Sequence, residues 1–148
     1  MREKKIVANN KKARFDFFIE DIFEAGIVLT GTEIKSIRQG KVSINESYAK
    51  VRDGEIFILG MNISPYEQGN IFNVDPLRER KLLLSKREIR KIDEINRLKG
   101  KTIIPLRVYI NERGLAKVQI GIGTGKKNYD KRDSIAKKDA ERKMKIAA

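Results

Sequence analysis

Short runs of apolar residues, separated by residues typical of turns, recur along the first 124 positions of the chain. Short runs that are rich in β-branched and aromatic side chains and bounded by Gly, Asp or Asn are typical of β-strands. The pattern therefore predicts a mainly β domain. Its expected strands are Phe15–Ile19, Ile27–Leu29, Ser47–Arg52, Glu55–Met61, Arg80–Leu84, Thr102–Ile110 and Leu115–Ile122.

Two pairs of the expected strands are joined by tight turns. Asp53 and Gly54 connect one pair, and an Asp-Gly dipeptide is among the strongest hairpin signals because both residues must accept a positive φ. Asn111–Gly114 joins the last two strands, with its glycine able to take the bulge position. Pro105 interrupts the first strand of that pair, which predicts a sheet edge or a β-bulge there.

Two helices are marked by capping signals. Thr30 and Glu33 form a capping box before the first helix, and Gly40 is placed to end it. Ser85 and Glu88 repeat the box before the second helix, which carries its apolar residues on one side. The apolar residues and the terminal glycine of the second helix are Ile89, Ile92, Ile95, Leu98 and Gly100.

A small sheet of mostly antiparallel strands must hide its edges, and closing into a barrel does so. We therefore expect an OB-like antiparallel β-barrel with two or three helices, a fold that often binds oligonucleotides but does not by itself prove function. Ser64–Asn73 contains proline, glycine and two asparagines, which predicts a long surface loop. Residues 1–124 are expected to form this single domain, with a basic N-terminal arm.

The chain changes character at residue 125. Residues 125–148 hold many charges, and their only sizeable apolar side chains are those of Tyr129, Ile135, Met144 and Ile146. A helix this short and polar is marginal alone in water. We expect a basic C-terminal tail that is disordered when free and helical on a partner.

The net charge of +13 is concentrated at the two ends of the chain. Residues 1–14 hold six basic and one acidic side chain, and residues 125–148 hold nine and four. The 110 residues between them hold 18 basic and 15 acidic side chains. A nearly neutral body with cationic ends suits binding to a polyanion, so we expect a nucleic-acid partner. The alternative is a pair of solvated tails that only aid solubility.

The composition argues against catalysis. The chain has no histidine and no cysteine, which removes the commonest general base, the commonest metal ligand and every thiolate site. We expect no enzyme activity, no cofactor and no metal. No apolar run is long enough to span a bilayer, and the charged N-terminus does not read as a secretory signal. The protein is expected to be cytoplasmic, without a membrane partner, and monomeric.

Three further features have alternative interpretations. The glycines of Gly121–Gly125 match neither a P-loop nor a dinucleotide fingerprint, and we expect a flexible exit from the last strand with lysines free to meet phosphates. An acidic cluster (Glu20, Asp21 and Glu24) predicts a turn at a strand end, or acceptors for base edges and 2′-hydroxyls. Tyrosines could stack on bases. On strands, Tyr48 and Tyr109 are expected to pack instead, whereas Tyr129 lies in the cationic tail.

Several stretches carry a resemblance to one protein family over about Asn10 to Arg142. The chain resembles SmpB, the SsrA-binding protein family. Phe15 and Thr124 depart from the histidine and arginine that are frequent there. The matching stretches are Asn10-Lys-Lys-Ala-Arg14, Phe23-Glu-Ala-Gly26, Gly31-Thr-Glu-Ile-Lys-Ser36, Asp75-Pro76, Arg80-Lys-Leu-Leu-Leu84, Lys86-Arg-Glu88, Asn111-Glu-Arg-Gly114, Gly125-Lys-Lys127 and Tyr129-Asp-Lys-Arg132.

The resemblance implies an OB-like barrel that binds the tRNA-like part of transfer-messenger RNA. The tail would enter the vacant messenger path of a stalled ribosome and fold there as a helix. The implied decoding-centre residues are Tyr129, Asp130, Lys131 and Arg132. The implied RNA-binding residues are Asn10, Lys11, Arg14, Glu24, Leu83 and Lys117, with Gly125, Lys126 and Lys127 at the root of the tail.

Two alternatives to the function that the resemblance implies remain open, and so does the role of Leu83. A structural ribosomal protein with basic extensions would enter every ribosome and prefer no small RNA. An RNA-modifying enzyme would need a cofactor loop that the sequence does not contain. Leu83 belongs to the run Leu82–Leu84, which is most simply core, so a packing role stands level with RNA contact.

Overall fold

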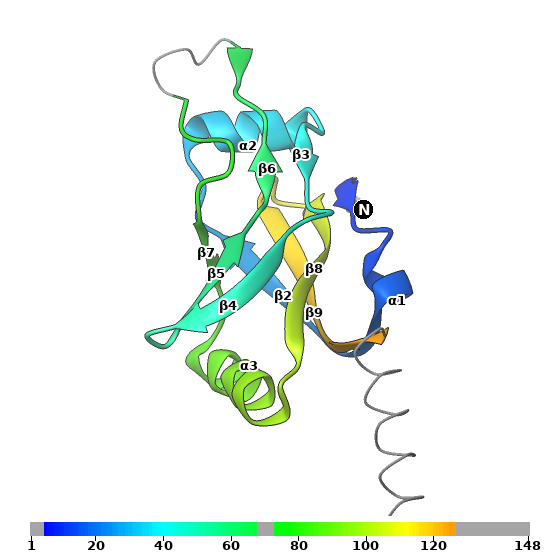
Figure 1. Cartoon of the computed structure of the whole chain (residues 1–148). Coiled ribbons are helices and arrows are strands. Elements are labelled where there is room, and N and C mark those ends of the chain that lie inside the picture. The colour runs from blue at the N-terminus through cyan, green and yellow to red at the C-terminus, as the bar shows by residue number, and fades with distance from the viewer. Residues whose placement is uncertain (1–4, 68–72, 127–148) are drawn as a thin grey trace, which may run out of the picture.

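The computed structural model describes residues 5–67 and 73–126. Twelve elements follow one another along these segments, and strands predominate (Figure 1). They are β1 (Lys5–Asn9), α1 (Ala13–Asp16), β2 (Phe17–Ile27), α2 (Gly31–Arg38), β3 (Val42–Ser43), β4 (Tyr48–Arg52), β5 (Glu55–Leu59), β6 (Asn62–Ile63), β7 (Arg80–Leu83), α3 (Lys86–Lys99), β8 (Thr102–Ile110) and β9 (Ala116–Gly125).

The main sheet closes on itself. Its strands pair antiparallel in the order β8-β4-β5-β7-β2-β9, and β9 pairs again with β8. β1 pairs antiparallel with the second half of β8, beyond the point where β4 pairs with it. β3 pairs with β6 in a separate two-stranded sheet. The ring leaves few strand edges open to other chains. The prediction of a mainly β, OB-like antiparallel barrel with two or three helices is thereby confirmed.

The core fills the interior of this ring. Alternate residues of the strands point inward, so that Ile56 and Ile58 of β5 and Val118 and Ile120 of β9 are fully buried. The two longer helices, α2 and α3, lie at opposite ends of the barrel (Figure 1). Each seals its end with an isoleucine that packs into the same core, and these two side chains are Ile37 and Ile92.

The local turn and cap signals are confirmed. Both helices begin with the predicted capping box, in which the Thr30 and Ser85 hydroxyls accept from the N–H three residues on. Asp53 and Gly54 adopt φ values of 52° and 75°, as a tight hairpin turn requires. The register shifts immediately after Pro105, which is the predicted bulge. Leu98 was placed in the apolar stripe of the second helix, but it is exposed.

The N-terminal third differs from its prediction. β2 is one strand of 11 residues, so the two separate strands and the acidic turn between them are wrong. Glu20 lies within that strand and forms an ion pair with Lys101, which lowers the pKa of its carboxyl. The basic arm contains β1, which pairs with β8, and it is followed by the one-turn helix α1.

The glycine-rich segment near residue 125 is part of the sheet. β9 continues to Gly125, which pairs with Phe17, so the prediction of a flexible exit from the strand is wrong. Gly123 sits directly against the carbonyl of Phe18, where a side chain would collide with backbone. The glycines of this segment therefore allow close approach of strands.

A buried ion network joins α2 to the start of β7 and the residues just before it. Glu33, which completes the first capping box, is 3% exposed. Its carboxylate accepts from Arg80 Nε at 2.5 Å and from Arg78 Nη2 at 2.6 Å. Arg80 is fully buried and donates also to the carbonyls of Met61 and Pro76. Burial raises the pKa of Glu33, but the hydrogen bonds from Arg78, the Thr30 N–H and Arg80 hold this pKa below its ordinary value.

Candidate RNA-binding surface

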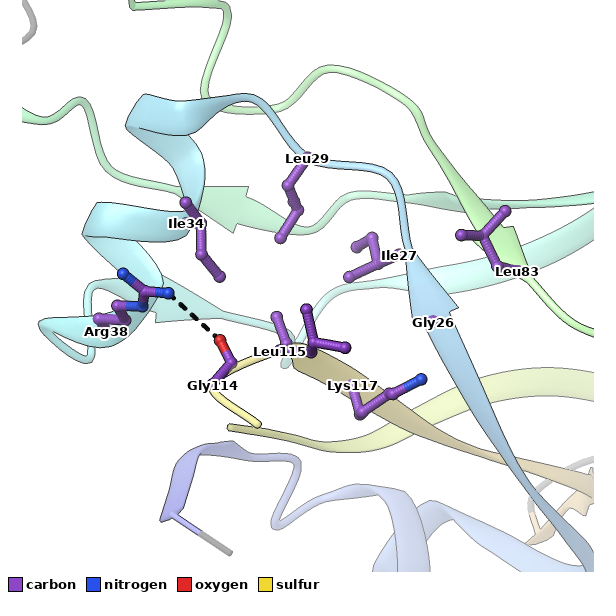
Figure 2. A pocket seen from close by; sticks show the side chains of 10 residues that line it. Gly26, Ile27, Leu29, Ile34, Arg38, Leu83, Gly114, Leu115 and Lys117 are labelled. Atoms are coloured by element: carbon purple, nitrogen blue, oxygen red, sulfur yellow. Dashed lines mark hydrogen bonds between the residues drawn. The ribbon is translucent and has the colours of Figure 1, made fainter. Parts of the chain in front are cut away.

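A groove of about 320 Å³ opens between the ends of several strands and α2 (Figure 2). Most of its lining residues are apolar, and two are cationic, Arg38 and Lys117. Arg38 donates from Nη2 to the carbonyl of Gly114 at 3.3 Å, which ties α2 to the turn between β8 and β9. The lining residues are Gly26, Ile27, Leu29, Ile34, Arg38, Leu83, Gly114, Leu115, Ala116 and Lys117.

Gly26 lies at the point where the predicted RNA-binding residues of two other strands meet. It pairs with Leu83 of β7 on one side and with Lys117 of β9 on the other. A Cβ atom at this position would lie 3.3 Å from the Leu83 Cβ and 3.7 Å from the Lys117 Nζ. The absent side chain leaves this part of the surface open beside one apolar and one cationic side chain.

The groove exposes large apolar side chains. Leu83 is 50% exposed and Leu115 is 53% exposed, whereas the neighbouring Leu82 is buried in the core. The packing role for Leu83 is therefore wrong, because its side chain points out of the barrel. Exposed apolar side chains beside a cation suit a ligand that offers both apolar faces and negative charge, as a nucleotide does.

Glu24 stands on the same outward face of β2, two residues before Gly26. Tyr109 hydrogen-bonds to the Glu24 carboxylate from β8, across β9. Burial and this hydrogen bond raise the pKa of the Tyr109 phenol. The tyrosine packs as predicted, while the exposed carboxylate keeps acceptor capacity for a second donor.

The outward face of β2 connects the groove to a second cationic region. Residues 18 and 26 face outward at the two ends of the strand, about 26 Å apart at the usual rise. At the far end, Lys126 Nζ lies 5.0 Å above the ring of Phe18 and donates to the carbonyl of Arg14 at 2.9 Å. Phe15, beside Arg14, is 83% exposed. Phe18 is 44% exposed, and Tyr48, which was expected to pack, is 48% exposed.

The predicted RNA-binding residues fall into two groups. Leu83 and Lys117 line the groove, and Glu24 lies beside it on β2, two residues before Gly26. Lys11, Arg14, Gly125 and Lys126 lie with α1 and the end of β9. Asn10 belongs to the second group but is only 7% exposed, and its amide donates to the carbonyls of Pro105 and Ile44. Lys127 and the four decoding-centre residues, Tyr129, Asp130, Lys131 and Arg132, lie outside the described residues.

Sequence reasoning alone missed three residues of this surface. Gly26 and Leu115 line the groove, and Phe18 meets Lys126 at the other end of β2. A signal for Phe18 was present, because alternation along residues 17–27 leaves it on the same face as Glu24. In the described part of the chain, no group of three or more acidic side chains could hold a metal ion. No helix there is long and apolar enough to cross a bilayer.

A closed antiparallel barrel with an exposed groove of apolar and cationic side chains defines an OB-like nucleic-acid-binding protein. Comparison with known proteins gives the family. The family model described as SmpB protein matches residues 7–148. The chain belongs to the SmpB family.

The relatives agree with this assignment over nearly the whole chain. The SsrA-binding protein of Acetivibrio thermocellus is 61% identical over 142 residues, covering 96% of this chain and 92% of the relative. The SsrA-binding protein of Geobacillus thermodenitrificans is 54% identical, covering 98% and 93%. A chain of the solved structure "tmRNA-SmpB: a journey to the center of the bacterial ribosome" is 49% identical, with a TM-score of 0.67 and coverage of 80% and 82%.

Proposed function

We propose that this protein is an RNA-binding adaptor that binds the tRNA-like domain of transfer-messenger RNA and delivers it to stalled ribosomes. The observation that carries the proposal is the convergence of Glu24, Leu83 and Lys117 around Gly26 in a member of the SmpB family. The names of its relatives and of its structural neighbour support the same partners. An adaptor of this kind works in the cytoplasm and needs no catalytic residue of its own.

Each of these three residues offers a different contact to a folded RNA. The Lys117 ammonium is a point charge suited to a phosphate. The exposed face of Leu83 suits an unstacked base or a ribose. The Glu24 carboxylate accepts hydrogen bonds, for which a 2′-hydroxyl or a base amino group is the natural donor. Together these contacts recognise shape and unpaired bases rather than a duplex sequence.

The tail supplies the second half of the proposed function. Residues 1–124 act as the RNA-binding barrel, and residues 125–148 enter the messenger path and become helical there. Gly125, Lys126 and Lys127 meet RNA at the root of the tail. Tyr129, Asp130, Lys131 and Arg132 reach the decoding centre. The support for this division is the concentration of nine basic side chains in the last 24 residues.

Binding to the isolated tRNA-like domain is expected to depend steeply on salt. Each phosphate that a cation neutralises contributes roughly −0.7 to −0.9 to the slope of log affinity against log salt. About four engaged phosphates should therefore give a slope near −3. Filter binding between low and physiological salt measures this slope, with an elongator tRNA of similar size as the specificity control. A flat response, or equal affinity for both RNAs, would contradict the proposal.

Glu24→Ala is expected to weaken binding of that RNA by roughly ten- to a hundredfold, because a hydrogen bond to a charged group is lost. Tyr109→Phe is the matched control: it removes the neighbouring hydroxyl and leaves the carboxylate in place. Its RNA affinity should stay within about twofold of the unmodified protein. Thermal melts of both variants separate folding from binding. If the two variants lose the same stability and neither loses affinity, Glu24 has a structural role only.

A further inference from the structure

The third helix holds the whole positive excess of the body of the domain, residues 15–124, which excludes the basic N-terminal arm. Between residues 15 and 124 the chain has 18 basic and 15 acidic side chains. Six of the basic and three of the acidic side chains belong to α3. The remainder of this body is balanced, with twelve of each sign. The near neutrality of the body therefore hides a segregation of charge onto one element.

The charges of α3 are arranged on one side. Successive helical residues are about 100° apart around the helix axis. The residues on the side opposite the buried Ile92 therefore form an outer face that extends from one end of the helix to the other. All five cations on this side are exposed, and they outnumber its two acidic residues, Asp93 and Glu94. Residues 86 and 97 lie about 16 Å apart along the axis. We call these five residues the α3 cationic face: Lys86, Arg87, Arg90, Lys91 and Arg97.

These cations lack the carboxylate partners that several basic residues have elsewhere on the barrel. Arg52, Lys81 and Lys101 each form an ion pair with a carboxylate. Within the described segments, only Arg97 of the α3 cationic face has such a pair, to Asp93 at a loose 3.9 Å. Lys91 Nζ lies 5.9 Å above the ring of Phe23 and has no carboxylate pair among the described residues. Exposed cations in a fixed row without close carboxylate partners present a positive potential to a polyanion. Three of the five are arginines, whose planar guanidinium groups bind phosphate in bidentate geometry.

The α3 cationic face is separate from the groove. No residue of α3 lines the groove, which is bordered by α2. Figure 1 shows α2 and α3 at opposite ends of the barrel. Capping at both ends and the buried Ile92 hold α3 firmly against its end of the barrel, so its outer face has a fixed direction. The groove and the α3 cationic face therefore lie on different parts of the barrel.

We propose that the α3 cationic face binds the phosphate backbone of ribosomal RNA while the groove holds the tRNA-like RNA. The proposal rests on the proposed function, because it takes the groove as the site of the first RNA. Its basis is charge complementarity: the positive excess of residues 15–124 belongs to α3, whose five cations on this face are exposed. The helix lies at the end of the barrel away from α2. Binding through phosphates should show no base preference but a clear dependence on salt.

The test compares two targets with the full-length Arg87→Gln/Arg90→Gln variant. Glutamine keeps helix propensity close to that of arginine while it removes the charge. Binding to purified ribosomes, without transfer-messenger RNA, should lose about two units of salt slope, one for each phosphate contact removed. Affinity for the isolated tRNA-like domain should stay within about twofold. The matched control is Lys41→Gln/Lys50→Gln, which removes two exposed lysines from other elements. It should leave both slopes unchanged.

Each other outcome has a defined meaning. An unchanged ribosome slope for the α3 variant, or an equal loss in the Lys41/Lys50 control, would overturn the proposal. A loss confined to the tRNA-like domain would also overturn it, because the helix would then serve the first RNA. Lys117→Gln separates these failures from failure of the proposed function. The Lys117→Gln variant should bind the tRNA-like domain more weakly and bind ribosomes normally. If its affinity for the tRNA-like domain is unchanged, the assignment of the groove to that RNA is wrong, independently of the result for the α3 variant.

Discussion

Glu33→Ala is expected to lower the free energy of unfolding by about 3–5 kcal/mol, the usual cost of removing one partner of a buried ion pair. The substitution leaves the fully buried Arg80 without its carboxylate and Arg78 with one fewer acceptor. It also removes the acceptor of the Thr30 N–H at the start of α2. Denaturant unfolding at neutral pH measures the loss.

The matched control for this change is Glu55→Ala. Glu55 pairs with Lys81 at 2.8 Å, but both side chains are more than a third exposed. Such surface pairs contribute about 0–1 kcal/mol, so this variant should unfold almost like the unmodified protein. Equal losses in Glu33→Ala and Glu55→Ala would show that burial of the network does not matter.

The same network predicts a pH dependence of stability. The folded state holds the pKa of Glu33 below its ordinary value, so the carboxylate stabilises the fold above the unfolded-state pKa. This contribution is lost as the pH falls through the lowered folded-state pKa. The unmodified protein should therefore lose more stability than Glu33→Ala on acidification. Unfolding curves across the acid range test the sign, and parallel losses in the two proteins would refute it.

Replacing Lys131 and Arg132 together by alanine is expected to abolish tagging of stalled peptides while binding of the tRNA-like RNA survives. Lysine and arginine side chains cannot accept the N–H groups at a helix start, and under the proposed function the partners of these two residues are phosphates of ribosomal RNA. Asp130 differs, because it can cap that helix, and alanine there should cost about 1 kcal/mol of helix stability. Tagging in a translation extract is the measurement.

A chain cut after Lys127 is the control for this double variant. All the strands and helices assigned in the described segments end before that residue. The shortened protein should melt cooperatively, keep its β signal in circular dichroism, and lose RNA affinity only through the missing charges. Normal tagging of stalled peptides by the Lys131/Arg132 variant would show that these residues do not act at the decoding centre. The tail would then be only a solvated extension.

The sequence by itself determined the local structure of this protein. Both capping boxes, the Asp53–Gly54 turn and the bulge at Pro105 are set by contacts within a few residues or by the geometry of single residues. Apolar runs separated by turns were sufficient to predict an antiparallel barrel. The resemblance to the SmpB family named groove residues such as Leu83 and Lys117 but placed none of them.

Tertiary structure decided which side of each element faces out. Leu82 and Leu83 are identical in chemistry, yet one is buried and the other is exposed, because β7 pairs with β2 in a register that points only one inward. Arg80 is fully buried beside Glu33, 47 residues earlier in the chain, whose carboxylate accepts from its Nε at 2.5 Å. These outcomes depend on pairing between distant segments, and local pattern carries no information about that pairing because register is set by the packing of the whole barrel.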